Sequence, residues 1–88
     1  MKPVPRYYFH LHDRSGPVPD PDPRELPDLD VVRAQALKGA RSIICEDVRY
    51  GRIDLTGRID VHDDAGKLVL SLPFTEAVEL VLGEDGAR

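Results

Sequence analysis

Apolar and polar residues alternate near the N-terminus. Over residues 6–13, one side of an extended chain carries Tyr7, Phe9 and Leu11, and the other carries Tyr8, His10 and His12. A period of two residues is typical of a strand with one buried and one open face. The pattern predicts a β-strand over residues 5–13.

A proline-rich segment follows this strand. It contains Pro17, Pro19, Pro21 and Pro23 at alternating positions. Proline fixes φ and has no amide hydrogen, so the segment is unsuited to the middle of a sheet. Residues 14–27 are predicted to form an extended edge or a polyproline-like arm on the surface. The pattern leaves open whether residues 17–26 include a second strand.

The longest regular pattern lies in residues 28–50, where apolar side chains recur every three or four residues. They are Leu29, Val32, Ala36, Leu37, Ala40, Ile43, Ile44 and Val48. This spacing predicts an amphipathic helix that begins at a capping Asp28 or Asp30 and ends at Gly51. Gly39 lies inside the helix at a cost of about 1 kcal/mol relative to alanine. Its presence predicts a close approach between the helix and the sheet.

Two further alternating segments predict a β-hairpin over residues 57–72. The side chains predicted to point inward are Ile59, Val61, Leu68, Leu70 and Leu72. Gly66 can adopt the positive φ that closes the turn after Asp63 and Asp64. After Pro73, apolar residues at helical spacing predict a short second helix over residues 73–82. A polar tail follows at residues 83–88.

The order of these elements predicts one α+β domain over residues 1–88. We expect a small antiparallel or mixed sheet of three to four strands, with one long and one short helix packed on one face, in the order β-(β)-α-β-β-α. The opposite face is then open. On it the alternation places Tyr8, His10, His12, Arg58, Asp60, His62, Val69 and Ser71. These include all three histidines of the chain.

Composition narrows the class of protein. With 41% hydrophobic and 32% charged residues, the chain has the make-up of an ordinary soluble domain. Its apolar stretches are far shorter than a membrane span. The lone Cys45 cannot form an internal disulfide, which fits a reducing compartment. We therefore expect a cytoplasmic protein without membrane partners.

Nucleic-acid binding is an alternative that the charge argues against. The predicted long helix carries Arg33, Lys38, Arg41 and Arg49, and Tyr8, His10 and His12 could stack on bases. The net charge is −4, whereas nucleic-acid-binding domains usually carry a basic excess. A solvated helix face balanced by neighbouring acids is the simpler interpretation.

A metal site is the sharpest chemical hypothesis that the histidines suggest. His10 and His12 are two residues apart on one strand, and His62 lies across the predicted sheet on the same face. Imidazole nitrogens together with a carboxylate such as Asp60 can complete a tetrahedral zinc shell. Solvated or hydrogen-bonded surface histidines explain the same pattern more simply. We therefore expect no bound cofactor, with zinc as the alternative.

No catalytic constellation is recognisable in the sequence. Asp63 and Asp64 lie in the predicted turn, where acids commonly cap backbone amides. Asp20 and Asp22 match a calcium loop poorly, because its glycine and terminal glutamate are missing. The serines, which occur in no nucleophile motif, are Ser15, Ser42 and Ser71. We predict that the chain is not an enzyme.

Several segments taken together resemble a known family. They are PRYYFHLHD near the N-terminus, ELPDL and VRAQAL around the start of the long helix, and VHDDAGKLVLSLPFTEAV in the C-terminal half. These segments are similar to a family of short, mainly alphaproteobacterial proteins known as a domain of unknown function (DUF6894). The resemblance implies the same compact α/β domain in a bacterial protein and carries no catalytic assignment. The segment PVPDPDP departs from the simpler turn and short strand expected in such relatives.

A protein-interaction module is the leading functional hypothesis. The uncovered sheet face and the edge arm both offer surfaces to another protein. The residues expected to contact it are Tyr8, His10, His12 and Val69. The partner is predicted to be an unidentified protein or a second copy of the chain, which would form a homodimer.

Overall fold

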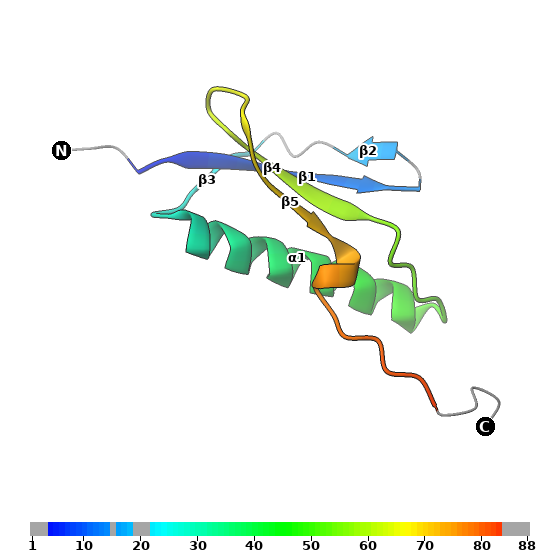
Figure 1. Cartoon of the computed structure of the whole chain (residues 1–88). Helices are drawn as coiled ribbons and strands as arrows, with labels where there is room; N and C mark the ends of the chain where they lie inside the picture. The colour runs from blue at the N-terminus through cyan, green and yellow to red at the C-terminus, as the bar shows by residue number, and fades with distance from the viewer. Residues whose placement is uncertain (1–3, 15, 19–21, 84–88) are drawn as a thin grey trace.

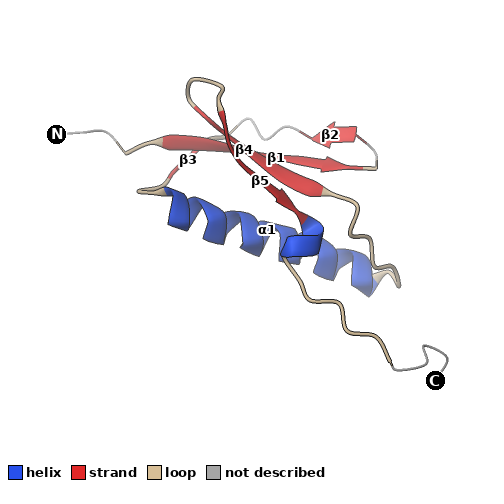
Figure 2. Ribbon diagram, in the orientation of Figure 1, coloured by secondary structure: helices blue, strands red, loops and turns tan. Residues whose placement is uncertain are grey.

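One sheet backed by one long helix forms the structure, a computed structural model that describes residues 4–14, 16–18 and 22–83 (Figure 1; Figure 2). The strands are β1 (Arg6–Asp13), β2 (Gly16–Val18), β3 (Arg24–Glu25), β4 (Arg58–Asp63) and β5 (Leu68–Pro73). The helical elements are α1 (Leu29–Arg49) and a 3₁₀ turn, η1 (Phe74–Glu76). Ser15, Asp20 and most of the predicted tail at 83–88 lie outside the described residues.

The strands lie in the order β2-β1-β4-β5, with β3 paired to the other end of β1. All pairs are antiparallel, so the predicted α+β class is confirmed. Within the described residues, however, the sheet has five strands rather than three or four. The difference arises because both ends of the proline-rich arm pair with β1. β2 pairs with residues 11–13, and β3 pairs with residues 6–7. Both strands lie at the sheet edge, where proline is tolerated.

The helix α1 is bounded much as the sequence predicts. Asp28 is its N-cap, and the Oδ1 atom accepts a 2.9 Å hydrogen bond from the backbone N–H of Val31. This bond satisfies one of the free amides of the first turn. At the other end, Gly51 follows the C-cap Tyr50 with a φ of 83°, which ends the helical backbone.

The core lies between α1 and one face of the sheet (Figure 2). The buried stripe of α1 consists of Val32, Ala36, Ala40 and Ile44. The buried side chains outside the helix are Tyr7, Leu26, Ile59, Val61, Leu72, Phe74 and Ala77. Because the middle of the helical stripe is alanine, strand side chains fill the space between the two layers. No described element covers the opposite face of the sheet.

The alternation of the hairpin is interrupted in β5. Val61 pairs with Leu70, but the next residue, His62, pairs with Leu68, so the register shifts between them. An extra residue in one strand changes the facing of the residues beyond it. Leu68, predicted to point inward, is therefore 50% exposed. Val69, predicted on the open face, is half-buried and packs against the core.

The predicted second helix over residues 73–82 is wrong beyond its first turn. Only η1 is helical, and residues 78–83 are irregular. Phe74 and Ala77 are buried in the core, whereas Leu80 and Val81 are exposed. A short helix is marginal in water unless its apolar face packs against another element. Helical spacing alone therefore did not form a helix here.

Gly39 is not a point of forced close approach. A Cβ atom at this position would lie 3.5 Å from Ile59 Cδ1, an ordinary van der Waals distance. A closer approach occurs at Gly57, where a Cβ would lie 2.8 Å from Phe74 Cε2 and 3.0 Å from the His12 carbonyl oxygen. The Gly57 carbonyl also accepts a 2.9 Å hydrogen bond from the Phe74 amide. Glycine is therefore required where η1 meets the start of β4.

Candidate functional site

The open face is the side of the sheet opposite α1, and its side chains come from β1, β4 and β5. The strand register pairs Tyr8 with His62, His10 with Asp60, His12 with Arg58, and Asp60 with Ser71. Residues opposite one another in an antiparallel pair point to the same face. The prediction that the three histidines share the face away from the helix is confirmed.

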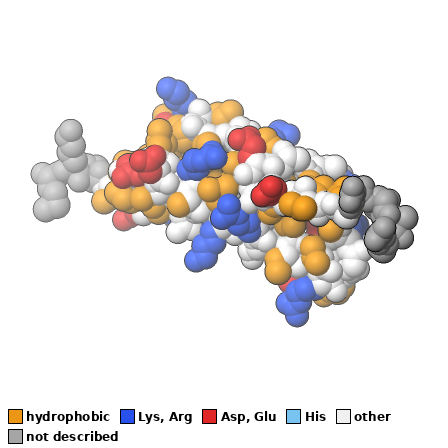
Figure 3. All heavy atoms as spheres, turned by 60° about the horizontal axis from the view of Figure 1, so that its bottom comes forward, with side chains coloured by type: hydrophobic (Ala, Val, Ile, Leu, Met, Phe, Trp, Pro, Cys, Tyr) orange, Lys and Arg blue, Asp and Glu red, His pale blue; other side chains and the backbone are white. Residues whose placement is uncertain are grey.

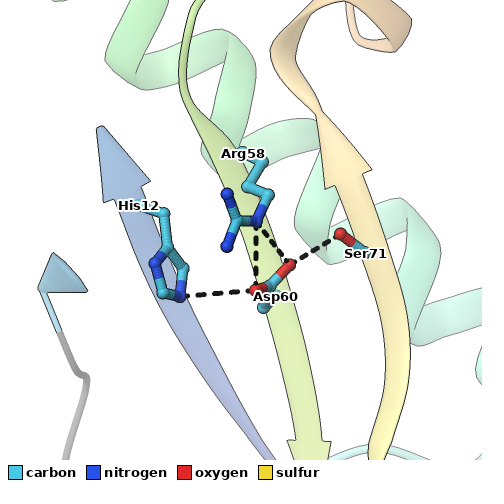
Figure 4. Close-up of polar contacts among 4 residues, drawn as sticks. All are labelled: His12, Arg58, Asp60 and Ser71. Carbon is cyan, nitrogen blue, oxygen red and sulfur yellow. Dashed lines mark hydrogen bonds and ion pairs between the residues drawn. The ribbon is translucent and has the colours of Figure 1, made fainter. Parts of the chain in front are cut away.

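A polar cluster around Asp60 lies on this face and is called the Asp60 cluster (Figure 4). The carboxylate accepts a 2.7 Å hydrogen bond from Ser71 Oγ. It also lies 3.2 and 3.3 Å from Arg58 Nε and 3.3 Å from His12 Nε2. Asp60 is only 8% exposed although no described helix covers it, because side chains from β1, β4 and β5 enclose it.

The contacts of the Asp60 cluster stabilise a negative charge. Burial by itself raises the pKa of the Asp60 carboxyl. Hydrogen bonds from Ser71 and Arg58, the charge of Arg58 and the imidazole of His12 together outweigh this effect. The pKa of Asp60 therefore lies below its usual value. The cluster holds an ionised carboxylate in a fixed position at neutral pH.

Three half-buried rings, Tyr8, His10 and His62, continue the open face and are called the aromatic row. Tyr8 and His10 are stacked, with centroids 6.4 Å apart and an interplanar angle of 8°. The His62 centroid lies 5.1 Å from that of His10, with the rings tilted by 54°. Tyr8 Oη donates to Asp64 Oδ1 at 3.4 Å, and Arg6 Nε pairs with Asp64 at 3.1 Å. These contacts hold one end of the row in place.

The three histidines considered as zinc ligands do not converge on one point. His12 contacts Asp60, whereas the rings of His10 and His62 contact each other. The described residues contain no group of three or more His, Cys, Asp or Glu side chains arranged to hold a metal ion. His62 Nδ1 is buried and has no hydrogen-bond partner among the described residues. Zinc binding at this face stays the alternative to the predicted absence of a cofactor.

The side chains considered for catalysis have structural contacts or lie exposed. Asp63 Oδ1 accepts 2.9 Å hydrogen bonds from two backbone amides and so closes the β4–β5 turn, as predicted. Ser71 donates to Asp60 rather than to His12, and this geometry lacks the serine–histidine contact of a hydrolytic triad. Asp22 and Ser42 are exposed. The lone Cys45 is exposed as well.

The outer face of α1 carries the basic side chains that raised the question of nucleic-acid binding. Figure 3 shows Lys and Arg side chains on this side of the molecule interspersed with acidic and apolar ones. Arg41 Nε donates to the Ala77 carbonyl oxygen at 2.6 Å. Arg49 pairs with Glu46 at 3.4 Å. The surface is therefore mixed in charge, and part of its basic character is used within the chain.

A polar groove at one end of the sheet has no signal in the sequence pattern. It has a volume of about 340 Å³ and is lined by residues that include Asp13, Arg14 and Asp54. Asp54 accepts hydrogen bonds from the Thr56 hydroxyl at 2.6 Å and amide at 3.0 Å, which lower its pKa. Arg14 pairs with the same carboxylate at 3.4 Å. The end of β1 and the loop before β4 meet here only after folding, so no local spacing marks the groove.

The fold and the open face together define a small α+β domain with a helix-backed antiparallel sheet. The chain belongs to the family described as Domain of unknown function (DUF6894), whose model matches residues 6–75. This match confirms the family that the sequence segments resemble. It includes the five described strands, α1 and the residues of the open face. No curated protein and no solved structure matches the chain. Among the described residues, no helix is both long and apolar enough to cross a membrane.

Proposed function

We propose that this domain is a non-catalytic protein-interaction module that binds another protein through its open face. The observation that carries the proposal is that α1 lies on one side of the sheet only. The other side presents the aromatic row next to the Asp60 cluster, and no described element lies over it. A cytoplasmic location in an alphaproteobacterial cell is part of the proposal.

The side chains of the open face suit a protein partner. Tyr8 and His10 combine ring surface with polar atoms, and aromatic residues are enriched at protein interfaces. Asp60 already has hydrogen-bond partners within the chain, so a partner does not have to compensate a buried charge. Side chains that are held before binding also lose less entropy when a partner binds. These properties support binding without catalysis.

Nucleic-acid binding and zinc binding are the alternatives for this face. Bases could stack on Tyr8 and His10, but the net charge of −4 disfavours phosphate. Zinc would have to recruit His62 together with His10 or His12, which contact different groups. Both alternatives are therefore ranked below protein binding and serve as outcomes of the test.

The proposal is tested by capturing partners from a lysate of the source cells with three tagged baits. They are the wild type, Tyr8→Glu on the open face, and Ser42→Glu on the exposed side of α1. After nuclease treatment, the wild type and Ser42→Glu should recover the same protein. Tyr8→Glu should recover about tenfold less of it, which corresponds to ~1.4 kcal/mol of binding free energy. Circular dichroism should show that all three baits are folded.

Equal recovery by all three baits, or recovery of no protein by the wild type, would contradict the proposal. Salt-dependent binding of single-stranded RNA or DNA to the wild type, lost in Tyr8→Glu, would support the nucleic-acid alternative instead. A rise in melting temperature of the untagged protein with zinc, absent from His62→Ala, would support the metal alternative.

A further inference from the structure

The edge of the sheet formed by β5 is exposed. Within the described residues, β5 pairs with β4 on one side and with no strand on the other. Figure 1 shows the chain after η1 running away from the sheet rather than along β5. An unpaired strand edge presents amide and carbonyl groups that a further strand can bind.

The register indicates which backbone groups of β5 face this edge. The Phe74 amide donates to the Gly57 carbonyl oxygen, and hydrogen-bonded and non-hydrogen-bonded pairs alternate along an antiparallel ladder. Counted from that bond, Asp60–Ser71 is a non-hydrogen-bonded pair of the β4–β5 ladder. The amide and carbonyl groups of Ser71 therefore point away from β4, whereas those of Leu70 point toward it.

The two edges of the sheet differ in their protection against further pairing. β5 has the sequence LVLSLP, without a charged residue and with its proline in the last position. At the opposite edge, β2 and β3 have three and two residues and flank a segment with prolines at 17, 19, 21 and 23. Short strands and prolines are common means of blocking edge pairing. The described strands at the proline-rich edge are therefore protected against further pairing, whereas β5 is not.

We propose that β5 pairs with β5 of a second copy of this chain, antiparallel and about a two-fold axis. This inference goes beyond the proposed function, because it uses the edge of the sheet and not its open face. The assembly closes at two copies, since only the proline-rich edges are left at its ends. The two-fold axis also places both open faces on the same side of one continuous sheet.

The sequence of β5 suits pairing with itself. With Ser71 at the two-fold axis, the outward amide and carbonyl groups of the two Ser71 residues bond each other. Leu70, which packs against the core, then lies opposite the fully buried Leu72 of the second copy, so both side chains point to the covered face. β5 carries no charged residue, so no like charges face each other across the pair.

Exposed apolar side chains add to the area that such a dimer can bury. Leu68 is 50% exposed, and Leu80, Val81 and Leu82 after η1 are 54%, 77% and 73% exposed. Stable interfaces bury about 1,200–2,000 Å² in total, so side chains beyond the strand edge must contribute. In an antiparallel pair, the end of β5 in one copy lies next to the start of β5 in the other. Residues 80–82, which follow the end of β5, then come near the exposed Leu68 at the start of the other β5.

Light scattering on the full chain tests the assembly with two matched variants. Leu68→Lys places a charge in β5, and Val18→Lys places one on the opposite edge at a residue that is equally exposed, at 50%. The wild type and Val18→Lys should have twice the 9.8 kDa mass of one chain. Leu68→Lys should have the mass of one chain with an unchanged circular dichroism spectrum.

A cross-link tests the register. In a Cys45→Ala background, Ser71→Cys should form a disulfide-linked dimer under mild oxidation, because the two residues would meet at the axis at a Cα separation that a disulfide can bridge. Val18→Cys in the same background should stay monomeric on a non-reducing gel. A single-chain mass for the wild type at every concentration, or a twofold mass for Leu68→Lys, would overturn the proposal.

The two proposals fail separately in these experiments. Tyr8→Glu should keep the twofold mass while losing the captured partner. Leu68→Lys should lose the twofold mass, and only its mass is compared because Leu68 lies opposite His62 on the open face. A loss of partner capture in Tyr8→Glu thus reports on the open face, and a loss of dimer mass in Leu68→Lys reports on β5.

Discussion

The two faces of the sheet bury neighbouring residues by different means. In β4, Ile59 is 6% exposed and the adjacent Asp60 is 8% exposed. Ile59 packs into the apolar core on the side of α1. Asp60 points to the open face, where hydrogen bonds and ion pairs from Arg58 and Ser71 enclose it. Nearly equal burial is reached by side-chain packing on one face and by polar contacts on the other.

This difference determines how each face responds to change. An apolar core loses stability according to the volume removed from it. A buried carboxylate loses stability when its charge or its partners are removed, and its contribution depends on pH. The covered face should therefore be sensitive to side-chain volume, and the open face to charge and pH.

The largest effect is expected for Leu72→Ala on the covered face. Leu72 is fully buried, and a truncation of this kind costs about 2–5 kcal/mol of unfolding free energy. Denaturant unfolding followed by circular dichroism measures the loss. Val48→Ala, at a half-exposed position of α1, should change the unfolding free energy by no more than about 0.5 kcal/mol.

A milder substitution keeps this prediction testable if Leu72→Ala does not fold. Ile59→Val removes one methylene from the same core and should cost about 0.5–1.5 kcal/mol. Losses at Leu72 and Ile59 no larger than the loss at Val48 would contradict the assignment of the covered face as the main apolar core.

A smaller, pH-dependent effect is expected for Asp60→Asn on the open face. The variant should lose about 1–3 kcal/mol at neutral pH, because Arg58 and His12 lose a charged partner. The folded pKa of Asp60 lies below its usual value of 3.8. The charge therefore stabilises the fold above the unfolded pKa, and this contribution is lost as the pH falls through the folded pKa.

Unfolding free energies of the wild type and Asp60→Asn, measured from neutral pH down to about pH 3, check this sign. The difference between the two proteins should shrink in acid. Glu79→Gln, at an exposed position, is the control and should show no such trend. A difference that stays constant with pH would show that the carboxylate charge does not stabilise the open face.

The smallest effect, a gain, is expected for Gly39→Ala on the helix above the covered face. The new Cβ would meet Ile59 at an ordinary contact distance of 3.5 Å, while alanine is favoured over glycine in a helix by about 1 kcal/mol. Thermal unfolding should show a higher melting temperature. The same change at Gly57 should lower it, because a Cβ there would lie 2.8 Å from Phe74. A lower melting temperature for Gly39→Ala would show that the helix and the sheet approach closely at this position, as the sequence predicted.

The sequence by itself determined the elements whose signals are local. The period of two in β1, the four-residue spacing in α1 and the capping Asp28 each involve residues close together in the chain. The turn after Asp63 is local as well, and its hydrogen bonds formed as expected. The face on which the histidines lie followed from the same alternation, because side chains in a strand point alternately to its two sides.

Tertiary structure decided the features that depend on distant residues. Helical spacing after Pro73 did not produce a helix, since only Phe74 and its near neighbours reach the core. The Asp60 cluster joins His12, Arg58 and Ser71 from three strands, and the bulge in β5 changed the exposure of Leu68. The spacing of residues along a helix or strand determines the face on which each side chain lies. Which side chains meet across elements depends on register and packing, which no single segment contains.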